Sequence, residues 1–259
     1  MTETRSAVLS ARELAVSFGA LRALDGLSFD VVSGRMLGII GPNGAGKSTA
    51  FNAITNVVSH SGSAVLKGED ISAVPTQDLA RRGLKRTFQQ NSFFGELTVL
   101  ENAVCALHAS HASSLAESLF LPLREMRRRA LAEEAAASLL SAFEIDERWF
   151  AQLPGEIPYG TQRLLSVALA YGDGAEVLLL DEPAAGIGGN DMTALSLVLR
   201  RLKEQGVALV LIEHHMDLIM ALADEIVVLD QGRQIATGTP EAVRQNPAVR
   251  EAYLGREQE

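Results

Sequence analysis

The sequence predicts an α/β fold whose core sheet is mostly parallel. Three observations support this prediction: short apolar runs alternate with helical stretches, one apolar run leads at once into a glycine-rich turn and a helix, and 47% of the 259 residues are hydrophobic. A chain of this length suits one large domain or a domain with a subdomain, and it can bury a substantial core.

The N-terminal part of the chain predicts an antiparallel meander. Residues 7–18 and 27–32 are both β-like, and only the short Leu-Arg-Ala-Leu-Asp-Gly segment separates them. Residues 36–40 form the next strand, which is apolar throughout, and a helix is predicted over residues 47–58. Further buried strands are predicted at residues 84–88, 177–181, 207–212 and 226–229.

The chain changes to helical character between the strands at 84–88 and 177–181. Residues 119–143 place apolar side chains at helical spacing between strong helix formers. We therefore expect an inserted helical subdomain at residues 96–158. The flanking segments 1–95 and 159–240 then form the core with its β-subdomain, and residues 241–259 form a C-terminal tail.

Composition excludes several classes of function. The chain has 23 Lys and Arg against 32 Asp and Glu, a net charge of −9, which argues against a general binder of nucleic acid or anionic lipid. Its single cysteine excludes an intrachain disulfide and a cysteine-based zinc site. The apolar runs are far shorter than the roughly 18 residues of a membrane span, and the N-terminus lacks a signal-peptide pattern. We expect an intracellular protein whose membrane role, if any, comes through a partner.

A glycine-rich phosphate loop is predicted at residues 41–49. The string Gly-Pro-Asn-Gly-Ala-Gly-Lys-Ser-Thr fits G-x-x-x-x-G-K-[ST], and it lies between a predicted buried strand and a predicted helix as the motif requires. The glycines let backbone N–H groups surround phosphate oxygens, and the helix N-terminus adds its positive dipole end. By itself the loop does not separate kinases, small GTPases and ATPases. The predicted nucleotide contacts in it are Asn43, Gly44, Ala45, Gly46, Lys47, Ser48 and Thr49.

Lys47 and Ser48 have distinct predicted roles within this loop. Lys47 would reach the β- and γ-phosphates, and Ser48 would offer its hydroxyl to Mg²⁺. Thr49 can add a polar contact nearby.

Two carboxylates follow the apolar strand at 177–181. Asp181 is the natural Mg²⁺-side residue, and Glu182 is placed to orient and deprotonate a water that attacks the γ-phosphate.

The strand at 207–212 also ends in polar residues, and His214 there could hydrogen-bond the γ-phosphate. A histidine that merely caps the strand is the alternative, whereas metal binding is disfavoured because His214 and His215 point in different directions.

With these residues assembled, the sequence resembles the ATP-binding cassette (ABC) ATPases, a P-loop NTPase family. Residues 86–90, Arg-Thr-Phe-Gln-Gln, followed by 96–102 look like that family's glutamine loop and the start of its helical subdomain. The tail strings at 238–240, 246–249 and 252–255 are similar to those of the ATP-binding subunits of branched-chain amino acid importers. The resemblance covers almost the whole chain, and the tail strings favour the importer branch.

The resemblance implies roles for further residues. Phe18 occupies the position of an aromatic residue that stacks on adenine. Gln89 would contact Mg²⁺ or the lytic water and link the site to the membrane partner. Glu182 takes the position of the catalytic base, and His214 that of the switch histidine. Phe93 and Phe94 would belong to a coupling groove near residues 91–94, with packing in the chain's own core as the alternative.

The signature segment departs from the general pattern of the family. Where many cassettes have Leu-Ser-Gly-Gly-Gln, residues 157–161 read Ile-Pro-Tyr-Gly-Thr, so the serine hydroxyl is absent. The segment Tyr159, Gly160 and Thr161 would then present N–H groups of a helix end to the nucleotide of a partner. The pair Tyr159-Gly160 supports the importer branch. The usual acidic or amide residue near Gly188 is also missing.

The resemblance implies an ATPase that uses ATP and Mg²⁺ and energises the uptake of branched-chain amino acids or related small solutes. Its implied partners are a second copy or a similar ATPase subunit, integral membrane permease subunits and, indirectly, a solute-binding protein, with no nucleic acid. It would lie peripherally at the cytoplasmic face of the inner (plasma) membrane. The alternatives are a nucleic-acid-associated ABC ATPase and a P-loop small-molecule kinase. The solute and the choice between homodimer and heterodimer stay open.

Overall fold

A computed structural model describes residues 6–87, 93–108 and 122–254 of the chain. The structure divides into two compact units. The first comprises Met1–Arg86, Ala175–Ala185 and Leu199–Glu259, and the second comprises Thr87–Gly174 and Gly186–Val198. Each unit is described by itself below.

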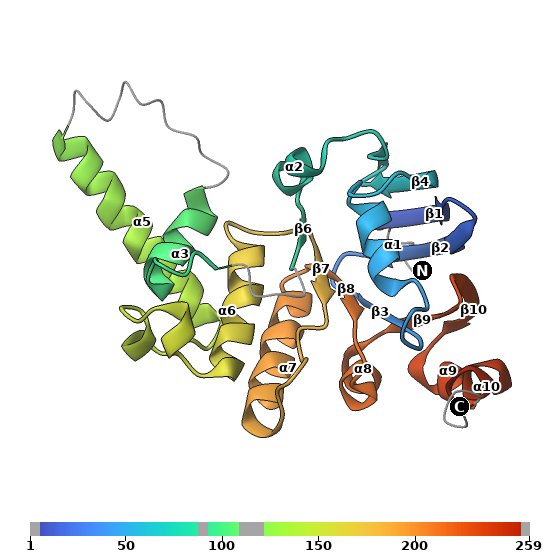
Figure 1. Cartoon of the computed structure of the whole chain (residues 1–259). Helices are drawn as coiled ribbons and strands as arrows, with labels where there is room; N and C mark the ends of the chain where they lie inside the picture. Colours follow the sequence, from blue (N-terminus) through green and yellow to red (C-terminus); the bar gives the residue numbers. More distant parts are fainter. Residues whose placement is uncertain (1–5, 88–92, 109–121, 255–259) are drawn as a thin grey trace, which may run out of the picture. The chain divides into compact units, whose positions relative to one another are not determined.

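The first unit is built on one large sheet (Figure 1). Within the described residues the sheet has ten strands, in the order β5-β4-β1-β2-β10-β9-β3-β8-β7-β6. The strands are β1 (Ala7–Phe18), β2 (Leu21–Val32), β3 (Met36–Ile40), β4 (Ser61–Leu66), β5 (Glu69–Asp70), β6 (Leu84–Arg86), β7 (Val177–Asp181), β8 (Ala208–Ile212), β9 (Glu225–Asp230) and β10 (Arg233–Gly238).

The pairing of these strands confirms the predicted fold class. Strands β6, β7, β8, β3 and β9 pair parallel with one another, whereas β1, β2, β4 and β5 pair antiparallel with one another. Between these two groups, β10 pairs antiparallel with β9 and parallel with β2. Every residue of β3, β7 and β8 is buried, as expected of parallel strands covered on both faces. The carboxyl ends of these three strands therefore lie at one edge of a buried sheet, where ligands of α/β proteins gather.

The predicted strand at 27–32 and the predicted helix at 47–58 differ by several residues from the structure, while the strands predicted at 207–212 and 226–229 differ by one residue at one or both ends. The predicted strand at 27–32 begins at Leu21, because β1 and β2 pair along their whole length through bulges that interrupt the alternation of buried and exposed residues. The predicted helix at 47–58 ends at Ile54 instead. The next residues explain this end: the Thr55 hydroxyl donates to the Phe51 carbonyl, and Asn56 has a left-handed φ of 56°.

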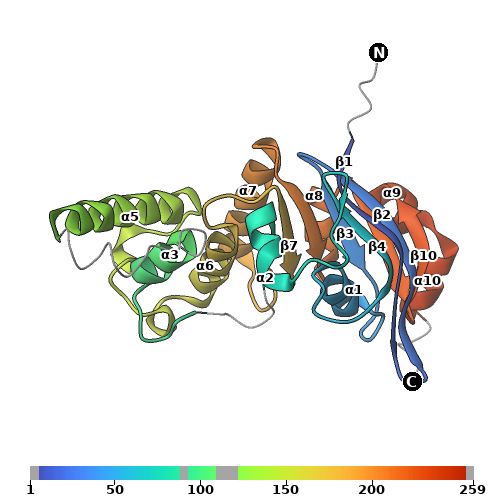
Figure 2. The same ribbon diagram turned by 90° about the horizontal axis from the view of Figure 1, so that it is seen from above.

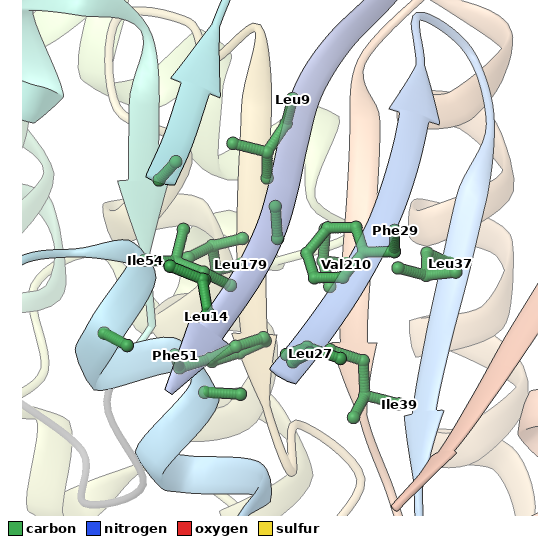
Figure 3. Packing of buried hydrophobic residues seen from close by; sticks show 14 of the residues in the cluster. Leu9, Leu14, Leu27, Phe29, Leu37, Ile39, Phe51, Ile54, Leu179 and Val210 are labelled. Carbon is green, nitrogen blue, oxygen red and sulfur yellow. The ribbon is translucent and has the colours of Figure 1, made fainter. Parts of the chain in front are cut away.

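The hydrophobic core of the first unit lies between α1 (Lys47–Ile54) and the sheet. Figure 3 shows Phe51 and Ile54 of α1 packed among side chains from the antiparallel and the parallel strands, Leu14 and Leu179 among them. The helix that follows the phosphate loop is thus anchored by apolar burial, which fixes the loop relative to β7. The other helices of this unit are α2 (Thr76–Leu79), α8 (Met216–Leu222), α9 (Pro240–Gln245) and α10 (Pro247–Leu254).

The second unit is helical. Between residues 93 and 174, helices and 3₁₀ turns are the regular elements of the described residues. The helices α3 (Val99–His108), α5 (Pro122–Ala142) and α6 (Tyr159–Tyr171) pack together, and Figure 2 shows α5 running alongside α3. Helix α7 (Gly189–Glu204) begins in this unit and ends in the first. No helix in the described ranges is long and apolar enough to cross a membrane.

Candidate functional site: a phosphate loop beside an acidic strand end

The phosphate loop occupies the six residues between β3 and α1, and two of its glycines are required by close backbone contacts. Gly41 and Gly46 have φ of 151° and 100°. A Cβ atom on Gly41 would lie 2.0 Å from the Leu229 carbonyl oxygen, and one on Gly46 would lie 2.6 Å from the Ala23 carbonyl oxygen. Side chains at these positions would therefore force the loop away from the sheet.

Gly44 differs from these two glycines because the space that a side chain would occupy there is empty. Its φ is 78°, and an added Cβ would meet no atom within 4 Å. The loop is thus closed against the protein at Gly41 and Gly46 and open at Gly44, as a cradle for a phosphate group requires. Asn43 and Ala45 lie in the same loop, while Ser48 and Thr49 lie in the first turn of α1.

Lys47 lies inside this loop rather than in solvent. Its side-chain amine donates hydrogen bonds to the carbonyl oxygens of Gly41 and Pro42, at 2.8 and 3.0 Å. Burial lowers the pKa of Lys47, although the negative charges of Glu182 and Asp181 act in the opposite direction. The lysine is thus held at the phosphate loop by its hydrogen bonds, and it interacts electrostatically with both carboxylates at the end of β7.

The acidic strand end is formed by Asp181, the last residue of β7, and Glu182. Asp181 is only 2% exposed, and burial raises the pKa of its carboxyl group despite an ion pair with Arg86. Glu182 adopts a left-handed φ of 50°, and its N–H donates to the Ile212 carbonyl at 2.9 Å. This turn separates the two acids, so that each carboxylate has different neighbours.

His214 contacts Glu182 directly. The Nε2 atom of His214 lies 2.7 Å from Oε1 of Glu182, although 32 residues separate them in the sequence. The structure therefore brings Lys47, Asp181, Glu182 and His214 together within the first unit.

Glu213 is a structural residue of this site that the sequence reasoning missed. It is 2% exposed, and its carboxylate accepts hydrogen bonds from the N–H groups of Ala184 (2.7 Å), His214 (3.0 Å) and His215 (3.3 Å). It thereby joins the segment after β7 to the segment after β8. A charged residue directly after an apolar strand was the available signal.

Arg86 is the second residue that the sequence reasoning did not assign. Its guanidinium donates to Asp181 Oδ2 at 3.0 Å and to Asn52 Oδ1 at 2.7 Å. It lies at the end of β6, so it connects an edge strand to both the acidic strand end and the helix that follows the phosphate loop.

The signature segment lies in the second unit. Helix α6 begins at Tyr159, and its N-cap residue, Pro158, makes no side-chain capping hydrogen bond. An added Cβ on Gly160 would lie 2.1 Å from the carboxyl carbon of Asp191, so this carboxylate excludes any larger residue in the observed arrangement. Thr161 follows in the same turn of α6.

Tyr159 packs within the second unit against Arg163 and Gly186. The Arg163 guanidinium lies 4.9 Å from the centre of the Tyr159 ring and donates to its hydroxyl. An added Cβ on Gly186 would lie 2.9 Å from the tyrosine ring. Tyr159 of the signature segment thus packs against the segment that follows β7.

The remaining predicted residues have separate locations. Phe18 ends β1 and is 55% exposed, as expected of an aromatic residue that is available to a ligand. Gln89 lies outside the described residues, as does the part of the predicted coupling groove at residues 91–92. Phe93 is half-buried and Phe94 is 63% exposed.

The glycine loop with its buried lysine and the acidic end of β7, a parallel strand of the same sheet, define a P-loop NTPase. Comparison with known families is more specific. The family model described as ABC transporter matches residues 24–185, and the model described as branched-chain amino acid ATP-binding cassette transporter matches residues 233–259. The chain belongs to the ABC transporter ATPase family, which confirms the predicted resemblance and the predicted ATPase activity.

Individual relatives agree with this family over nearly the full chain. The chain is 38% identical to the high-affinity branched-chain amino acid transport ATP-binding protein BraF of Pseudomonas aeruginosa, over 96% of this chain and 98% of that protein. It is 36% identical to LivG of Escherichia coli, a protein of the same description, with the same coverage of both chains. A solved nucleotide-free ATP-binding cassette from an ABC transporter superposes with a TM-score of 0.82 at 28% identity, covering 95% of this chain and 98% of that one.

Proposed function

We propose that this chain is the ATP-hydrolysing subunit of an importer of branched-chain amino acids or related small solutes. The observation that carries the proposal is the match of its C-terminal 27 residues, 233–259, to the branched-chain amino acid family model, together with relatives of that description over 96% of the chain. The chain would act peripherally at the cytoplasmic face of the plasma membrane, through separate permease subunits and, indirectly, a solute-binding protein.

The residues of the phosphate loop and of the acidic strand end fit ATP with Mg²⁺. The open side of Gly44 provides room for a phosphate, and Lys47 lies beside it with a buried amine. Ser48 and Asp181 supply the hydroxyl and carboxylate oxygens that Mg²⁺ prefers, and Gln89 would add an amide oxygen. When bound, Mg²⁺ neutralises charge on the phosphates.

The catalytic work is assigned to two residues of the first unit. Glu182 orients the attacking water and accepts its proton, and His214 holds the Glu182 carboxylate in place and contacts the γ-phosphate. The hydrogen bond between these two side chains is the geometric support for this division of roles. Phe18 stacks on adenine with its exposed ring.

A complete site needs a second subunit, either another copy of this chain or a similar ATPase. The N–H groups of Tyr159, Gly160 and Thr161 would contact the nucleotide held by the partner's phosphate loop. The test is the mass of the Glu182→Gln variant by light scattering in saturating ATP and Mg²⁺. We expect twice the 27.7 kDa of a single chain, and the double variant Lys47→Ala with Glu182→Gln should stay single.

A Glu182→Gln variant that stays single both alone and mixed with a similar ATPase subunit would overturn the proposed sandwich. If the mass doubles only when Glu182→Gln is mixed with the similar subunit, the complex is a heterodimer.

The surface proposed to face the permease includes Phe94. Its backbone is fixed on both sides by the buried Asn102, which accepts from the Phe94 N–H at 2.9 Å and donates to its carbonyl at 3.1 Å. An exposed aromatic ring on a rigid backbone is suited to a protein contact. The test is solute uptake by vesicles that contain the permease, with solution ATPase activity measured in parallel.

We expect Phe94→Ala and Phe93→Ala to lower uptake while ATPase activity in solution survives. Leu131→Ala, which removes a comparably exposed apolar side chain from α5, is the matched control and should leave uptake unchanged. Uptake that is normal in both phenylalanine variants would refute the coupling surface.

A further inference from the structure

The strongest unassigned feature of the site is the guanidinium of Arg86. Its side chain is only 10% exposed, and its guanidinium donates hydrogen bonds to residues of two different elements, α1 and β7. One guanidinium nitrogen donates to Asn52 Oδ1 at 2.7 Å, and the other donates to Asp181 Oδ2 at 3.0 Å. The guanidinium carbon also lies 5.3 Å from the centre of the Phe51 ring.

The contacts with α1 hold Arg86 independently of Asp181. Asn52 and Phe51 both belong to α1, whose first turn carries Lys47 and Ser48. Arg86 is therefore fixed relative to the phosphate loop even before the carboxylate is considered. A rigid donor at this position dictates how the Asp181 carboxylate is oriented, because one of its oxygens is committed to the guanidinium.

We propose that Arg86 is a positioning residue for the Mg²⁺-side carboxylate, and that it orients Asp181 so that nucleotide binds more tightly with Mg²⁺ than without it. This inference rests on the proposed role of Asp181 as the Mg²⁺-side residue. Carboxylates that bind metals are themselves held by hydrogen bonds, and loss of such a partner typically weakens metal affinity by about 10- to 100-fold.

The charge of Arg86 acts against this orienting effect. A cation close to the metal site repels Mg²⁺, so its removal alone would strengthen metal binding. The variant Arg86→Lys separates the two effects. It keeps the positive charge but lacks the planar fork that bridges Asn52 and Asp181, so it tests orientation without a change of net charge.

The experiment is calorimetric titration with ADP, which is not hydrolysed, first with Mg²⁺ and then with EDTA. The dissociation constant of ADP in EDTA, divided by that in Mg²⁺, measures how strongly Mg²⁺ and nucleotide support each other's binding. We expect this ratio to fall about tenfold in Arg86→Lys, with ADP affinity in EDTA within about twofold of the parent. A purely structural role would weaken both titrations together.

Two further variants complete the test. Arg82→Lys is the matched control, because Arg82 lies just upstream and pairs with Glu69 at the surface, and it should leave the ratio unchanged. Asn52→Ala removes the hydrogen bond that holds Arg86 on α1 but keeps the contact with Phe51 and the ion pair, and it should lower the ratio by a smaller factor. Should Arg86→Lys fail to fold, as judged by thermal unfolding, Asn52→Ala decides the question.

The variant Asp181→Asn separates failure of this inference from failure of the proposed site. A ratio that is unchanged in Asp181→Asn would refute the Mg²⁺ role of Asp181 itself. A ratio that falls in Asp181→Asn but is unchanged or higher in Arg86→Lys would overturn only the role of Arg86. A ratio that is higher in Arg86→Lys would show instead that the guanidinium holds Asp181 in an orientation that hinders Mg²⁺ binding.

Discussion

The Nε2 atom of His214 lies 2.7 Å from Oε1 of Glu182. The pair joins the segments after two neighbouring parallel strands, β7 and β8. Both segments are fixed by backbone contacts, since Glu182 donates its N–H to Ile212 and the His214 N–H donates to Glu213. The contact between the carboxylate and the histidine is therefore supported by the backbone of both segments.

Replacement of Glu182 by Gln should separate ATP binding from hydrolysis. The amide keeps the size of the side chain but cannot accept a proton from water, so we expect turnover to fall by at least about a hundredfold while ATP affinity is retained. Release of free phosphate and equilibrium ATP binding measure the two properties. Glu204→Gln, at the exposed end of α7, should behave like the parent. Near-normal hydrolysis by Glu182→Gln would remove Glu182 from its assigned role.

Glu213 should contribute to stability as well as to activity. In Glu213→Ala three backbone N–H groups near Glu182 and His214 lose their common acceptor, and all three hydrogen bonds are buried or partly buried. We expect the free energy of unfolding to fall by about 2–4 kcal/mol, together with a loss of ATPase activity. Glu213→Gln keeps one acceptor oxygen and should be milder. Equal stabilities of the parent and the alanine variant in urea titrations would contradict this account.

The local features of the site could be predicted from the sequence, whereas its distant contacts could not. The loop at 41–49 and the acids at 181 and 182 depend on short spacing and on the strand that precedes each of them. The ion pair of Arg86 with Asp181 joins residues 95 positions apart, and only the order of strands in the sheet brings them together. Bulges between Arg22 and Leu27 likewise obscured the start of β2, because they break the period of two on which strand prediction depends.

Alanine substitutions at two loop glycines should have different consequences. In Gly44→Ala the methyl group enters the open side of the loop, so we expect nucleotide affinity to fall while stability drops by only about 1 kcal/mol, because of the left-handed φ. In Gly41→Ala the methyl group would lie 2.0 Å from the Leu229 carbonyl oxygen, and stability should fall considerably more. Thermal unfolding and ADP titration of both variants measure this contrast. Reversal of the order of stabilities would disprove it.

Stability should decrease in acid partly through Asp224. Burial acts to raise the pKa of this carboxyl group, but hydrogen bonds from Lys203, the Met36 N–H and Arg35 outweigh burial and lower the pKa below 3.8. The folded state therefore favours the ionised form, so the contribution is complete above the unfolded-state pKa of about 4 and is lost as pH falls through the lower folded-state value.

The variant Asp224→Asn tests this contribution. Its free energy of unfolding should be about 1–3 kcal/mol below that of the parent at pH 7, and the difference should shrink below about pH 4. Denaturant titrations across this pH range measure the difference. A difference that is constant with pH would mean that the effect of the substitution is steric rather than electrostatic.

Gly160 and Asp191 should be energetically coupled within the second unit. In Gly160→Ala the new methyl group overlaps the position of the Asp191 carboxylate, which must rotate away at a cost of about 1–3 kcal/mol. In the Asp191→Ala background this overlap is gone, and alanine is a better helix former than glycine near the start of α6. The effect of Gly160→Ala on stability should therefore change from unfavourable to neutral or favourable.

A double-mutant cycle on thermal or urea unfolding measures this coupling energy, which additive behaviour of the two substitutions would refute. The cycle also separates folding from assembly, because the methyl group at residue 160 still covers the N-terminal end of α6 in the double variant. In the Glu182→Gln background, Gly160→Ala with Asp191→Ala should regain stability but should not form the ATP-dependent dimer. Asp191→Ala alone should dimerise, since the glycine and its N–H groups remain available to a phosphate.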